Sequence, residues 1–195
     1  SDLPDAIENT VKIAEKCNFE MEIGNWYFPK FKLPKKTPQI ALKELAYKCA
    51  KEHYGNKLRQ EIIDRLDFEL DVINPKGYAE YFLIMYDFIR WAEENDTPTN
   101  TRGSAGGCLV AFVLGITSVD PLIYQLPFER FLNKDRPSPP DIDLDIADDK
   151  RQGMLHHITE QYGKDAVAQI CTFGRMMAKG AVRDKIGRAS CRERV

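Results

Sequence analysis

The sequence has no CxxC pair among its five cysteines, no apolar run of about 18 residues, and no excess of one charge. Scattered single cysteines argue against a disulfide framework or a structural zinc site, and indicate reduced thiols in a cytosolic protein. Without a long apolar run, no membrane-spanning helix is predicted. The net charge of -2, from 28 Lys and Arg against 30 Asp and Glu, does not predict a uniformly basic surface.

Two motifs of nucleotide and metal chemistry are also missing. No Gly-Lys-Ser/Thr follows the glycines at the spacing of a Walker motif. His53, His156 and His157 are the only histidines, and the last two lack a third ligand nearby in sequence, so we interpret them as surface residues. What remains is an ordinary globular composition, with 43% hydrophobic residues in a chain of 195 that is long enough to bury a core.

Hydrophobic periodicity predicts a chain rich in helices. Apolar residues recur at helical spacing in four segments, at 4–17, 39–53, 57–73 and 77–94. The last of these is apolar on most of its surface, which predicts a buried helix. Proline and lysine accumulate within 18–37, so we expect an extended linker and a domain boundary there. A helix at 149–162 and a short strand at 166–171 are predicted farther along the chain.

The octapeptide PPDIDLDI at 139–146 is the most informative stretch, because three aspartates alternate with aliphatic residues in it. Strict alternation predicts a strand at 140–146 with one buried face, so Asp141, Asp143 and Asp145 share the other face. Carboxylates packed so closely need a compensating cation, and their hard oxygens suit Mg²⁺ or Mn²⁺. Two such ions clamp the attacking and leaving oxygens in a phosphoryl transfer, so the pattern favours a catalytic two-metal site.

Two other interpretations of the aspartates were weighed. A merely solvated strand face would use a residue that disfavours strands at three positions without a purpose. A calcium loop of the EF-hand type needs glycine at its sixth position and a carboxylate at its twelfth, where this chain has Ile146 and Gln152. Both interpretations are weaker than a catalytic site.

A glycine-rich turn, RGSAGG at 102–107, leads into the apolar segment CLVAFVLGI, which is predicted to be a helix. Glycines let a phosphate approach the backbone, and a helix N-terminus offers free N–H donors, although small residues before a helix can also serve close packing. Beside a metal site the phosphate interpretation gains weight, since a triphosphate needs both a cation and amide donors. Arg130 and Arg136 precede the aspartates and can neutralise phosphate oxygens by bidentate contacts.

Five segments occur in the order found in one known family: FELDVINPKGYAEYFLIMYDFI, TRGSAGGCLVAFVLGITSVDP, PFERFLN, PPDIDLDI and AVAQICTFGRMMAKGAVRD. Together they resemble the C family of bacterial replicative polymerases, the DNA polymerase III alpha subunits, over residues 2–184. The resemblance implies an internal fragment of a DNA-directed DNA polymerase, which transfers a nucleotide from a dNTP to a primer 3′-hydroxyl with two Mg²⁺ ions.

The resemblance also implies a fold class and a division into domains. The class is α/β: a helix-rich nucleotidyltransferase palm like that of polymerase beta. The palm is expected at 36–170, after the C-terminal end of a PHP domain and a linker at 1–35 and before the start of a thumb at 171–185. The last ten residues, 186–195, resemble one reading frame of a common sequencing adapter, so we hypothesise that they are an assembly artefact.

The family's motifs imply roles for individual residues. Asp141 and Asp143 match its catalytic metal ligands, whereas the third aspartate of the motif, Asp145, is not usually counted as a ligand. The residues expected to bind the dNTP phosphates are Arg102, Gly103, Ser104, Arg130 and Arg136. The family's third catalytic aspartate lies beyond the thumb, so this fragment alone is expected to be inactive.

The glycine loop departs from the family pattern GPGRGSAAGS. The residues TNT precede Arg102, the loop is one residue shorter, and Gly107 and Cys108 stand where Gly-Ser is usual. These differences leave the predicted Gly-Ser pair in place.

The family implies partners and a location: primer–template DNA, dNTP, and in the full-length protein a sliding clamp, a proofreading exonuclease and clamp-loader subunits, at the replication fork in the cytoplasm. Two alternatives stay open. One is a nucleotidyltransferase that works without a template, although the separation between Gly-Ser and Asp is shorter in the minimal members of that superfamily. The other is a non-catalytic fragment that binds nucleic acid.

Overall fold

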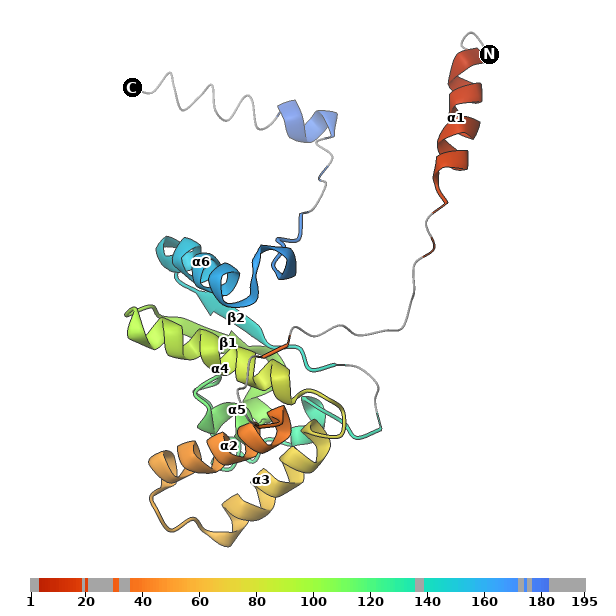
Figure 1. The fold of residues 1–195 in the computed structure, drawn as a ribbon. Helices are drawn as coiled ribbons and strands as arrows, with labels where there is room; N and C mark the ends of the chain where they lie inside the picture. Colours follow the sequence, from red (N-terminus) through yellow and green to blue (C-terminus); the bar gives the residue numbers. More distant parts are fainter. Residues whose placement is uncertain are drawn as a thin grey trace, which may run out of the picture. The chain divides into compact units, whose positions relative to one another are not determined.

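The computed structural model describes residues 4–18, 20, 30–31, 36–135, 139–171, 174 and 177–182 (Figure 1). Its contacts divide the chain into two compact units, Ser1–Asp148 and Asp149–Val195. Arg136, most of the predicted linker and the whole of 186–195 lie outside the described residues.

The four predicted helices of the first unit are confirmed, at nearly the predicted bounds. They are α1 (Pro4–Lys16), α2 (Pro38–Tyr54), α3 (Gln60–Ile73) and α4 (Ala79–Glu94). Pro38 opens α2 at a position where its missing N–H costs nothing. Gly77, with φ +76, makes the turn between α3 and α4, a conformation that favours glycine.

Helices α2, α3 and α4 bury their apolar faces together with α5 (Leu109–Val113). Helix α4 supplies seven buried residues, which confirms the prediction of a buried helix. The 3₁₀ turn η2 (Phe128–Arg130) is anchored by aromatic packing, since the ring of Phe131 lies 6.1 Å from that of Phe82 and 6.3 Å from that of Phe128, between centroids. This packing fixes the position of Arg130 at the end of the turn.

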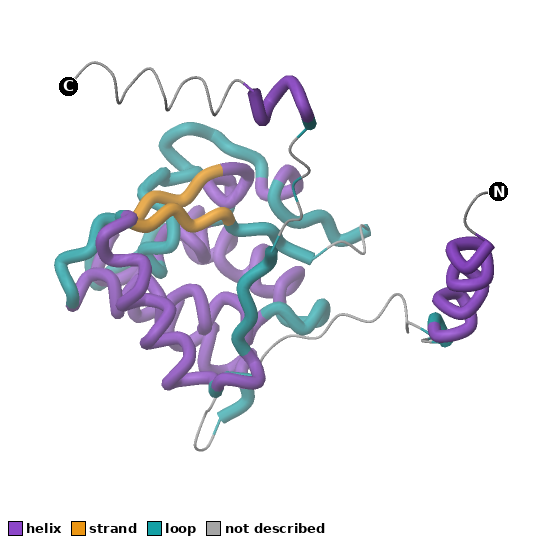
Figure 2. Tube along the Cα trace, turned by 90° about the horizontal axis from the view of Figure 1, so that it is seen from above, coloured by secondary structure: helices purple, strands orange, loops and turns teal. Residues whose placement is uncertain are grey.

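The sheet of the described residues has two antiparallel strands, β1 (Thr99–Arg102) and β2 (Asp143–Ile146), drawn side by side in orange in Figure 2. In their register Thr99 is opposite Ile146 and Arg102 is opposite Asp143. A helix-rich chain with this small sheet is consistent with the predicted α/β class. Within the described residues, no helix combines the length and the apolar character needed to cross a membrane.

Three predictions of local structure need correction. The aspartate strand begins at Asp143 and not at residue 140, because its partner β1 ends at Arg102 and Gly103 then turns with φ +84. The apolar segment after the glycines forms only the short α5, because Gly115 takes φ +75 soon afterwards. In the second unit, α6 (Arg151–Tyr162) is confirmed, but the strand predicted at 166–171 is absent; the 3₁₀ turn η4 (Lys164–Ala166) is followed by residues without regular secondary structure.

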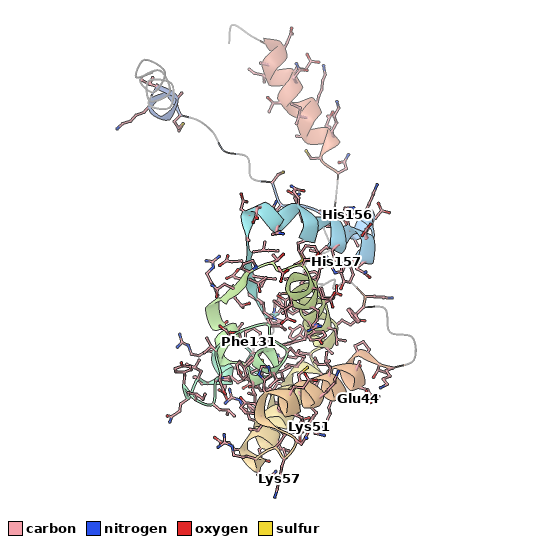
Figure 3. All side chains as sticks on the ribbon, turned by 90° about the vertical axis from the view of Figure 1, so that its left-hand side faces the viewer. Glu44, Lys51, Lys57, Phe131, His156 and His157 are labelled. Carbon is pink, nitrogen blue, oxygen red and sulfur yellow. The ribbon has the colours of Figure 1, made fainter. Side chains whose placement is uncertain are left out.

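The histidines of α6 partly match their interpretation as surface residues. His156 is exposed and its Nδ1 lies 3.5 Å from the Glu160 carboxylate, one turn along the helix. His157, its neighbour, is half-buried (Figure 3). No cluster of three or more His, Cys, Asp or Glu residues suited to a metal occurs in the described part of the chain.

Candidate active site

The alternation predicted for the aspartate segment is present in the structure. Asp141, Asp143 and Asp145 are exposed, whereas Ile142 is buried with 8% of its surface accessible. Leu144 and Ile146 are half-buried on the same side as Ile142. The three carboxylates therefore share one solvent-facing side of the strand and its approach, as side chains two apart must.

The third aspartate already has a cation from the chain itself. Arg102 makes a bidentate pair with Asp145, its Nε donating to Oδ2 at 2.5 Å and its Nη2 to Oδ1 at 2.9 Å. Arg102 is opposite Asp143 in the register and reaches Asp145 diagonally on the same face. This pairing raises the pKa of the Arg102 guanidinium above its ordinary value. The structure thus separates Asp145 from the other two aspartates, and it directs Arg102 toward Asp145.

Asp141 and Asp143 have no such partner: within the described part of the chain, neither forms a hydrogen bond or an ion pair. Oδ2 of Asp143 lies 3.7 Å from the point where a Cβ on Gly103 would stand. Since Gly103 has φ +84, a conformation rarely adopted by other residues, glycine brings the chain close beside this carboxylate. Two unpaired, exposed carboxylates are a donor set that suits Mg²⁺.

Tyr81 of α4 fixes the backbone between these two aspartates. The N–H of Ile142 donates to the Tyr81 hydroxyl at 3.2 Å. Burial raises the pKa of the Tyr81 phenol, the Ile142 N–H lowers it, and the nearby charges of Asp141 and Asp143 raise it further. No local pattern predicts this contact, because 61 positions along the chain separate the partners.

A pocket of about 400 Å³ lies against the glycine turn, which forms the 3₁₀ helix η1 (Gly103–Gly107). Its lining consists of Gly103, Ser104, Gly106, Gly107, Leu126, Pro127 and Arg130. Three of the residues predicted to bind phosphate, Gly103, Ser104 and Arg130, are therefore brought together. The pocket meets the aspartates at Gly103, whereas Arg102 is not part of its lining and Arg136 lies outside the described residues.

The first N–H groups of α5 are not free for a phosphate, contrary to our expectation for a helix that follows the glycines. The fully buried carboxylate of Glu69 accepts from the N–H of Leu109 and of Val110, both at 2.9 Å. The Sγ of Cys108 donates to the same carboxylate at 3.2 Å and accepts from the N–H of Ala111. The backbone donors near the pocket must therefore come from η1 and not from α5.

Arg65 and Glu69, both of α3, are functional candidates that sequence reasoning missed. Arg65 Nε donates to Glu69 Oε1 at 2.6 Å, and burial raises the pKa of the Glu69 carboxyl against the opposing effect of these donors. A signal was present in the sequence. Glu69 falls on the stripe of α3 that also carries the buried Ile62, Leu66 and Ile73, where an acid is costly unless it is paired.

Substitution at two adjacent glycines should have opposite effects. A Cβ on Gly107 would stand 2.8 Å from the carbonyl oxygen of Pro127, so the opposite wall of the pocket must shift, and we expect Gly107→Ala to destabilise the chain by about 1–3 kcal/mol. A Cβ on Gly106 meets nothing closer than 3.7 Å, so Gly106→Ala should be neutral or stabilising by up to about 1 kcal/mol. Urea unfolding of both variants checks this; equal stabilities would contradict it.

Comparison with known proteins shows which family this chain is similar to. The family described as the bacterial DNA polymerase III alpha NTPase domain matches residues 40–192. Similar proteins are the "DNA polymerase III subunit alpha" of Pseudomonas fluorescens, 47% identical over 94% of this chain, and that of Escherichia coli K12, 42% identical over 96%. That of Halalkalibacterium halodurans is 46% identical over 95%. The chain spans 17% of the length of each of these relatives.

Proposed function

Because the chain belongs to the family of bacterial DNA polymerase III alpha subunits, we propose that it forms the nucleotide-binding part of a DNA-directed DNA polymerase palm. The reaction is the transfer of a nucleotide from a dNTP to a primer 3′-hydroxyl during chromosomal replication. One observation carries the proposal: the Asp143 carboxylate adjoins Gly103, and Gly103 with Ser104 and Arg130 lines the pocket beside it.

In this proposal each residue has a distinct role. Asp141 and Asp143 would hold two Mg²⁺ ions, which would activate the primer 3′-hydroxyl and neutralise charge on the triphosphate. Gly103 and Ser104 let the phosphates approach the backbone, and Arg130 pairs with their oxygens. The chemistry is mainly positioning and charge stabilisation.

The wider assignment follows the family. Residues 36–170 are the palm, 1–35 the end of a PHP domain with its linker, and 171–185 the start of a thumb; Arg102 and Arg136 stay candidates for phosphate contacts. Primer–template DNA and dNTP are the substrates. The clamp, exonuclease and clamp-loader subunits are partners of the full-length protein in the cytoplasm. Activity belongs to that protein, which supplies a third catalytic aspartate.

Coupling between metal and nucleotide tests the function. With the full-length protein on a dideoxy-terminated primer–template, saturating Mg²⁺ should tighten binding of a fluorescent complementary dNTP by at least about tenfold, or 1.4 kcal/mol. Asp143→Asn should remove this dependence, and Asp145→Asn, at the aspartate already paired with Arg102, should keep it.

Each of the other outcomes identifies an alternative. A dNTP affinity that ignores Mg²⁺, together with intact DNA binding, would indicate a non-catalytic nucleic-acid-binding module. An affinity that responds to Mg²⁺ but not to the template base would indicate a nucleotidyltransferase that works without a template.

A further inference from the structure

One side chain joins two walls of the pocket without lining it. Nη2 of Arg65 donates to the carbonyl oxygen of Gly107 at 2.8 Å and to that of Leu126 at 3.1 Å. Gly107 belongs to the glycine wall, and Leu126 lies in the opposite wall just before η2. The two walls are separated in sequence by the whole of α5 and the loop after it. Arg65 therefore bridges the two walls.

The position of Arg65 is itself fixed by a buried carboxylate. Its Nε donates to Glu69 at 2.6 Å, and only 21% of its side chain is exposed, against 0% for Glu69. Glu69 in turn accepts the N–H groups of Leu109 and Val110 that follow the glycine turn. A buried, charge-assisted network of this kind favours a single geometry, because both oxygens of Glu69 and the Nε and Nη2 of Arg65 have partners.

We propose that Arg65 is a positioning residue for the dNTP pocket: its guanidinium holds the Gly107 and Leu126 walls at the separation that a triphosphate requires. This inference rests on the function proposed above. Gly103 and Ser104 belong to the same wall as Gly107, and Arg130 belongs to the same wall as Leu126. If the walls move apart, the backbone N–H donors and Arg130 can no longer contact the same phosphate group. Nucleotide affinity then falls while the protein stays folded.

Lysine cannot replace arginine in this duty. The guanidinium contacts Glu69 through Nε while a different nitrogen, Nη2, serves both carbonyls. An ammonium group has one nitrogen on a flexible stem, so it can keep the ion pair with Glu69 or bridge the walls, but not both. The Arg65→Lys variant keeps the positive charge beside Glu69 but cannot also bridge the two walls. It therefore tests the spacing of the pocket separately from the charge.

The experiment is steady-state primer extension by the full-length protein. For Arg65→Lys we expect a melting temperature close to that of the wild type, a KM for dNTP raised about tenfold, and a primer–template affinity within about twofold of the wild type. Arg90→Lys is the matched control. Arg90 pairs with Glu93 at 2.7 Å on α4, but it is half-exposed and is not part of the pocket lining, so all three quantities should stay unchanged.

A KM for dNTP within about twofold of the wild type in a folded Arg65→Lys protein would overturn the proposal. Should that variant unfold, the double substitution Arg65→Met with Glu69→Gln decides, since it leaves no unpaired buried charge and the amide oxygen at position 69 still offers an acceptor to the N–H groups of α5. A wild-type KM in the double variant would equally overturn it. Absence of extension by the wild-type protein would instead refute the proposed function, so the two failures are distinguishable.

Discussion

Asp143→Asn in the full-length protein should lower the rate of primer extension by roughly 10³-fold, about 4 kcal/mol of transition-state stabilisation. Asp141→Asn should have a similar effect. Both carboxylates are exposed and unpaired within the described residues, so the proposed metal ions are their only strong partners. An amide has the shape of the carboxylate without its charge, and it ligates Mg²⁺ weakly.

Asp145→Asn provides the matched control for this prediction. It lies on the same strand face but is held by the Arg102 guanidinium, so we expect extension to fall less than about tenfold. Single-turnover extension measures the rate, and a gel shift with primer–template DNA shows whether binding is intact. Equal losses at all three aspartates would contradict the division between two ligands and one paired residue. Near-normal extension by Asp141→Asn or Asp143→Asn would refute the metal assignment itself.

The largest effect on folding is expected from Glu69→Ala, which should lower the free energy of unfolding by about 3–5 kcal/mol. The substitution leaves the mostly buried Arg65 without a counter-charge and the N–H groups of Leu109 and Val110 without acceptors. Each loss leaves a desolvated polar group unpaired, which is more costly than the lost bond alone.

Glu93→Ala is the control for that measurement. Glu93 pairs with Arg90 at 2.7 Å, nearly the same separation as in the buried pair, but 55% of its side chain is exposed. Solvent screens such a pair, so its loss should cost less than about 1 kcal/mol. Urea unfolding of the two variants gives the comparison. If Glu69→Ala were no more harmful than Glu93→Ala, the buried network would not stabilise the α3–α5 contact.

The helices and the aspartate face were predictable because the sequence repeats them locally. Each turn of α3 returns an apolar residue to the core, from Ile62 through Leu66 to Ile73, and each second residue from Asp141 returns a carboxylate to solvent. Periods of this kind depend on the backbone alone and not on what the element packs against.

The contacts that distinguish the site residues could not be predicted in this way. The pairing of Arg102 with Asp145 depends on a register between strands about 40 residues apart, and the bonds from Arg65 to Gly107 and Leu126 depend on how α3 packs. The length of α5 was overestimated because an apolar pattern does not show where the chain turns. Only the acid at Glu69 on an apolar stripe hinted at the network.

The pairing of β1 with β2 has a consequence for how the site can fail. A two-stranded ribbon is only marginally stable by itself, and a slip of one residue would turn Asp143 and Asp145 toward the core and Leu144 and Ile146 toward water. The Arg102–Asp145 pair and the bond from Ile142 to Tyr81 both break in such a slipped ribbon. These two contacts therefore stabilise the observed register. A misaligned pair of strands would also displace the proposed metal ligands.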